Sequence, residues 1–216
     1  MSDAGLRSLA SDVVAGARQL DPACAEAIAA LRKRCPEAFV NGTLKPGEAG
    51  TPLVVPSENS SALIRAAFAD AANGGVGQQS DAVVWRDGQD ELIVFASGIR
   101  VILRTGLVLV GVPVYCDQTG RAEVTIVFAV GGSDAPTGLV MATETTPRGP
   151  DVIVSRWGDQ LTAVGYDALL RVAAGVTSAI GADVMDEPLI PAALEAGPDG
   201  LRITPQARYR IGRRLR

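Results

Sequence analysis

The chain of 216 residues contains no histidine. Histidine is the side chain whose unperturbed pKa lies nearest to neutral pH, and it is the commonest metal ligand in proteins. Its absence excludes the Ser-His-Asp triad, the Cys-His dyad and most zinc and iron sites. Any chemistry must therefore come from carboxylates, arginines and hydroxyl groups, and no catalytic, metal or cofactor motif built from these is recognisable.

Cysteine is scarce, and long apolar runs are missing. Cys24, Cys35 and Cys116 cannot all pair within one chain, and their spacing fits neither a zinc site nor a CxxC motif. Within the predicted strands, the longest uncharged apolar run covers residues 106–116, about half of the roughly 20 residues that a membrane-spanning helix needs. No basic segment followed by a hydrophobic block marks the N-terminus. We therefore expect a cytoplasmic protein without a membrane span.

Lysine is also rare, and the charge is unevenly distributed. The first 200 residues hold all 24 acidic residues and 14 basic ones, whereas the last 16 residues hold six arginines and no acidic residue. This basic tail is expected either to bind an acidic surface on a protein partner or on a second copy, or to remain a solvated end. We do not expect nucleic acid as a partner, because an acidic body repels phosphates. The candidate partner-binding residues of the tail are Arg208, Arg210, Arg213, Arg214 and Arg216.

The chain divides into four predicted segments. Apolar residues recur at helical spacing in residues 6–17 and again in residues 27–31, which predicts an N-terminal helical hairpin over residues 1–35. Residues 36–56 contain four prolines and three glycines, a composition typical of a linker or arm. A core domain is expected over residues 57–200, followed by the basic tail over residues 201–216.

The core domain is predicted to contain a helix, a series of strands and a long helix. The first helix covers residues 57–72, with Ser57 as its N-cap, and the long helix covers residues 156–180. The segment 107–115 is apolar on both faces, so we expect helices or a partner subunit to bury both sides of it. The predicted strands cover residues 82–86, 91–96, 99–104, 107–115, 121–130 and 139–145, with a short last one at 151–155.

This order of elements predicts an α+β fold. A mostly antiparallel sheet of about six strands follows the N-terminal helices, and the long C-terminal helix packs on that sheet. In element order alone, the chain resembles the helix-grip arrangement, in which a C-terminal helix closes an apolar cavity over an antiparallel sheet. The resemblance implies a pocket for an apolar ligand.

Four residues in the strand region are candidates for a ligand pocket or a subunit contact. Arg100 and Arg104 alternate with apolar residues, so they share one face of their strand. Glu123 is predicted to meet Arg100 or Arg104, as the strand register permits, and Tyr115 ends the apolar strand. A solvent-facing charged sheet is the plain alternative.

We therefore predict a non-catalytic structural or assembly protein that acts through contacts with itself or with a protein partner. The first alternative is a domain that binds or carries an apolar small molecule. The second is an enzyme that uses carboxylates or the tyrosines Tyr115 and Tyr166.

Overall fold

The computed structural model describes residues 52–73, 81–131, 141–143, 146–181 and 189–206. Within them lie two antiparallel sheets, of six and three strands, and two helices of 16 and 31 residues. The α+β class and the antiparallel sheet are confirmed. The predicted N-terminal helical hairpin, most of the predicted linker and the five tail arginines lie outside the described residues.

The six-stranded sheet is built around β5 (Leu107–Cys116). β6 (Gly120–Val130) pairs with one edge of β5 along its whole length, while β3 (Asp90–Phe95) and β4 (Arg100–Arg104) share the other edge. A 3-10 turn over Ala96–Gly98 separates β3 from β4. Pro113 lies opposite the gap between them. A residue without an N–H donor is tolerated there, because no strand pairs with that edge of β5 at this point. β2 (Ala82–Asp87) and β7 (Met141–Thr143) complete the sheet.

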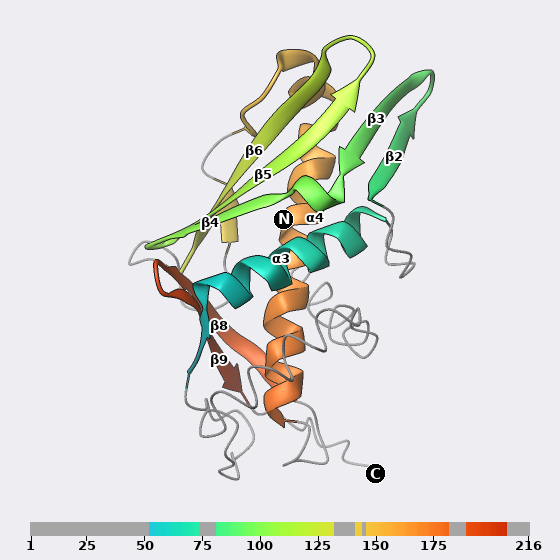
Figure 1. The fold of residues 1–216 in the computed structure, drawn as a ribbon. Helices are drawn as coiled ribbons and strands as arrows, with labels where there is room; N and C mark the ends of the chain where they lie inside the picture. The colour runs from blue at the N-terminus through green and yellow to red at the C-terminus, as the bar shows by residue number, and fades with distance from the viewer. Residues whose placement is uncertain (1–51, 74–80, 132–140, 144–145, 182–188, 207–216) are drawn as a thin grey trace, which may run out of the picture.

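Two helices lie against this sheet (Figure 1). α3 (Ser57–Ala72) has the predicted bounds, but its N-cap position is Pro56 and no side chain caps it, so the prediction of Ser57 as N-cap is wrong. α4 (Asp151–Gly181) is longer than predicted and spans about 46 Å at 1.5 Å per residue. The strand predicted over residues 151–155 is therefore wrong. The β-branched residues of this segment instead form the start of α4, because Ile153 is fully buried on the side of the helix that packs on the core.

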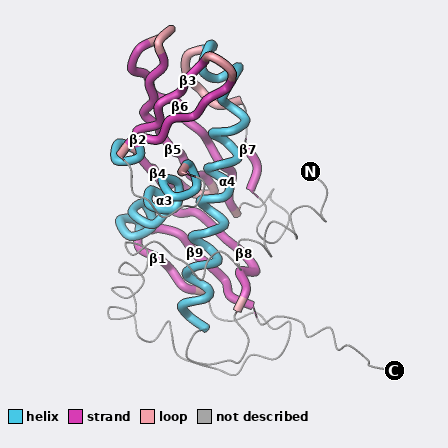
Figure 2. The backbone as a smooth tube through the Cα atoms, turned by 90° about the vertical axis from the view of Figure 1, so that its right-hand side faces the viewer, coloured by secondary structure: helices cyan, strands magenta, loops and turns pink. Residues whose placement is uncertain are grey.

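A smaller sheet follows α4, so this helix is not the last element of the chain. β8 (Ile190–Gly197) and β9 (Gly200–Gln206) form a hairpin, and β1 (Leu53–Pro56) pairs with β9. β1 and β9 thus occupy the end of the predicted linker and the start of the predicted tail. α4 runs alongside both sheets (Figure 2). The Gly106 N–H joins the sheets by donating to the Ala196 carbonyl at 2.9 Å.

The helices cover only one face of the six-stranded sheet. Phe128 of β6 meets Tyr166 of α4 edge to face, with 5.1 Å between the ring centroids. Trp85 of β2 packs near Trp157 of α4, and its indole N–H donates to the Ala72 carbonyl of α3 at 3.0 Å. These side chains belong to one buried apolar cluster that also includes the inward face of the small sheet. Among the described helices, none is both long and apolar enough to cross a membrane.

Candidate protein-interaction face

The face of the six-stranded sheet that points away from α3 and α4 carries the sequence-predicted site residues. In β5, side chains alternate between the two faces: the inward valines are fully buried, and the outward side chains are only partly buried. Gly111, which has no side chain, is the one buried residue of the outward row. The expectation that β5 is buried from both sides is therefore not met within the described residues. The inward side is covered by helices, whereas no described element covers the outward side.

We call the outward residues of β4, β5 and β6 the docking face. Its centre is a row across three strands, in which Ile102 lies opposite Leu109 and Leu109 lies opposite Val127. Ile102 is 52% exposed, and it is the most exposed of the large apolar residues in the described part of the chain. The docking face comprises Arg100, Ile102, Arg104, Leu107, Leu109, Gly111, Pro113, Tyr115, Arg121, Glu123, Thr125, Val127 and Ala129.

An ion pair crosses the centre of this face. The Arg100 guanidinium on β4 donates to the Glu123 carboxylate on β6, so the pair spans β5. Gly111 lies opposite Arg100, and a Cβ atom at Gly111 would be 3.2 Å from the Glu123 Cδ and Oε1 atoms. The missing side chain at Gly111 therefore makes room for the carboxylate. The two side chains are 70% and 35% exposed, so on its own the pair contributes at most about 1 kcal/mol.

The other two candidates lie towards opposite ends of the face. Tyr115 is opposite Arg121 on β6, whose guanidinium carbon lies 5.6 Å from the centroid of the Phe95 ring. Arg104 is exposed and lies opposite Leu107, at the other end of β5. The strand register thus brings Glu123 to Arg100 and leaves Arg104 apart from this pair.

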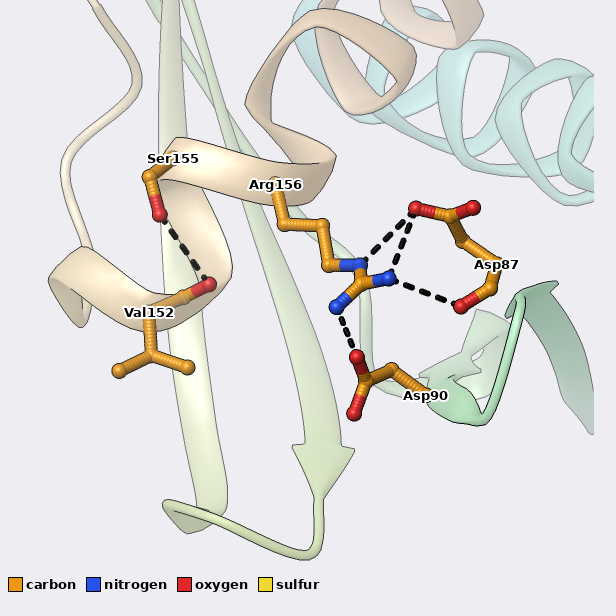
Figure 3. Close-up of polar contacts among 5 residues, drawn as sticks. All are labelled: Asp87, Asp90, Val152, Ser155 and Arg156. Carbon is orange, nitrogen blue, oxygen red and sulfur yellow. Dashed lines mark hydrogen bonds and ion pairs between the residues drawn. The ribbon is translucent and has the colours of Figure 1, made fainter.

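A second feature, a polar cleft of about 570 Å³, was not predicted from the sequence. It lies between the β2–β3 turn, the β5–β6 turn and the first turns of α4. Arg156 crosses it: its Nε and Nη2 atoms each lie 3.0 Å from Asp87 Oδ2, its Nη2 donates to the Asp87 carbonyl at 2.9 Å, and its Nη1 donates to Asp90 (Figure 3). The cleft is lined by Asp87, Gln89, Asp90, Glu91, Cys116, Asp117, Gln118, Val152, Ile153, Ser155, Arg156 and Trp157.

Arg156 thus ties the β2–β3 turn to α4. Three other contacts in or beside the cleft join residues that are close in the sequence. Glu91 pairs with Arg86 at 2.8 Å, and the buried Cys116 thiol lies 3.1 Å from the Thr119 hydroxyl. The Ser155 hydroxyl donates to a backbone carbonyl at 3.4 Å and has no base beside it among the contacts of the cleft. Within the described ranges, no group of three or more cysteine, aspartate or glutamate side chains is placed to hold a metal ion.

The two tyrosines considered for catalysis lie on opposite faces of the sheet. Tyr115 is on the docking face, whereas Tyr166 packs on Phe128 under α4. They cannot converge on one substrate atom, which removes the tyrosine pair as a catalytic arrangement.

Comparisons with protein families, with curated proteins and with solved structures give no match for this chain.

Proposed function

We propose that this chain is a non-catalytic assembly protein that associates with further copies of itself through the docking face. The observation that carries the proposal is the outward apolar row of the exposed Ile102 and the half-buried Leu109 and Val127. An antiparallel sheet that covers a core on one side usually presents polar residues to water on the other. Here, the outward residues at the centre of the sheet are apolar instead.

The composition of the face favours a protein surface as its partner. Protein interfaces are enriched in tyrosine and arginine around an apolar centre, which matches Tyr115, Arg104 and Arg121 around this row. Two sheets pack face to face with their strands within about 30° of each other, so a second sheet fits this surface. Burial of the exposed half of Ile102 contributes about 1 kcal/mol per copy.

The packing of α4 weighs against the apolar-ligand alternative. A Cβ atom at Gly165 would lie 2.4 Å from Phe128 Cζ, so at this point the helix backbone sits directly on the sheet. A helix-grip carrier needs space between these two elements, and Phe128 and Tyr166 fill it here.

The test is the solution mass of the full chain and of two variants, measured by light scattering over a range of concentrations. The wild-type chain should exceed its monomer mass of 22.3 kDa. Ile102→Glu should weaken association at least about a hundred-fold, because each copy loses apolar burial and gains a carboxylate in the contact. Val54→Glu is the matched control, because Val54 is also a strand residue and is 43% exposed in the other sheet.

Either of two results would overturn the proposal: a wild-type chain that stays monomeric, or an Ile102→Glu variant that associates as well as Val54→Glu. Circular dichroism and thermal unfolding of the variants show whether each one retains its fold.

A further inference from the structure

We infer that two copies dock about a two-fold axis that runs along β5, so that Arg100 of each copy comes within reach of Glu123 of the other. This inference rests on the proposed function, and it adds the arrangement and the charge pairing of the contact. It predicts a closed dimer, because a two-fold contact uses the same surface on both subunits.

The strand register makes the docking face complementary to itself about this axis. β4 and β6 flank β5 on either side, so rotation about β5 places β4 of one copy over β6 of the other. Ile102 then faces Val127 of the second copy, and Leu109 faces its own equivalent. The apolar row therefore packs on an apolar row.

The central ion pair selects this axis over the alternative. Arg100 starts from β4 and Glu123 from β6, so rotation about β5 places Arg100 of one copy over Thr125 of the other. Glu123 lies two residues along β6 from Thr125, within the reach that Arg100 already shows across β5 in its own chain. An axis perpendicular to the strands would keep each residue on its own side and bring Arg100 towards Arg100 of the second copy. Gly111 lies on the chosen axis, and its lack of a side chain leaves room there for the Glu123 carboxylate of the same copy.

The geometry of sheet packing agrees with this choice. A two-fold axis along the strands keeps the strands of both copies nearly aligned, as in sheets that pack with an angle of about 30°. The two copies of Arg104 come to lie about two strand spacings apart, roughly 10 Å, on either side of β5. That separation is about one Debye length at physiological salt, so their repulsion is largely screened.

A charge-swap experiment tests the arrangement. Arg100→Glu leaves two acidic groups at the centre of the face, and Glu123→Arg leaves two basic ones, so each variant alone should self-associate at least about tenfold more weakly than wild type. An equimolar mixture of the two should form a heterodimer of twice the 22.3 kDa chain mass, seen by light scattering and native mass spectrometry. The double variant in one chain should self-associate like wild type.

The matched control is the second exposed ion pair on the sheet, Arg86 with Glu91, which lies at the tip of the β2–β3 hairpin. Arg86→Glu, Glu91→Arg and their mixture should associate as wild type does. Loss of association in the single variants at positions 100 and 123, without recovery in their mixture, would overturn the two-fold arrangement. If Ile102→Glu still dissociates the wild-type oligomer in that case, the proposed function stands. A monomeric wild-type chain would overturn both.

Discussion

Substitution of two glycines in α4 tests how closely this helix packs on the six-stranded sheet. A Cβ atom at Gly165 would lie 2.4 Å from Phe128 Cζ and 2.9 Å from Cε2, whereas carbon atoms pack best at about 3.5–4.0 Å. A Cβ atom at Gly158 would lie 3.4 Å from Val154 Cγ1, which is an ordinary contact. The two sites share one helix and differ in the space beside them.

Gly165→Ala should destabilise the protein, while Gly158→Ala should stabilise it. Alanine gains about 1 kcal/mol over glycine in a helix interior at both sites. At Gly165, overpacking against the buried Phe128 ring costs about 1–3 kcal/mol and outweighs that gain. We expect the two variants to differ by about 2 kcal/mol in the free energy of unfolding, which corresponds to about 4–8 °C in Tm for a chain of this size.

Thermal and urea unfolding of both variants measure this difference, and Phe128→Leu supplies the control. In the Phe128→Leu background, the penalty of Gly165→Ala should shrink, because the atoms that clash are gone. If Gly165→Ala instead raises Tm as much as Gly158→Ala does, α4 does not rest on Phe128. Space would then exist beneath the helix, and the apolar-ligand function would become the stronger proposal.

Two further predictions concern the small sheet and the tail. Ser60→Ala should lower the free energy of unfolding, measured in urea, by about 1–3 kcal/mol. The buried Ser60 hydroxyl donates to the Val55 carbonyl at 2.8 Å and accepts from the Leu201 N–H at 3.1 Å, and the substitution removes both hydrogen bonds. A loss no larger than that of the exposed Ser155→Ala would contradict this reasoning. A chain that ends after Gln206 should keep both its Tm and its oligomeric state, since β9 and the docking face remain intact. Dissociation of this truncated chain, seen by light scattering, would instead assign assembly to the arginine tail.

Local patterns predicted the strands of the large sheet well because period-two alternation is a property of each strand alone. It placed Arg100, Ile102 and Arg104 on one face, as the structure has them. It did not decide which arginine meets Glu123, because that depends on the register of both strands against β5. The Arg156 cleft was missed for a similar reason: its partners are 66 and 69 residues away in the sequence.

The small sheet shows where charge misled the interpretation of the sequence. Leu201 and Ile203 alternate with Arg202 and follow a Gly-Pro-Asp-Gly turn, which is a hairpin signal. The arginines beyond this point made the whole segment look like a solvated tail. The pairing of β9 with β1, about 150 residues earlier, closes the sheet, and no local pattern indicates a contact at that separation.

This pairing also changes how the role of the tail can be tested. A truncation after Gly200 would remove nearly all of β9, the central strand of the small sheet. The fully buried side chains of Leu201 and Ile203 would be lost with it. Any dissociation seen then would report unfolding of that sheet and not the loss of arginine contacts. The docking face lies on the other sheet, and its apolar row contains no residue of the tail. The boundary at Gln206 therefore separates two explanations of assembly that the boundary at Gly200 would confuse.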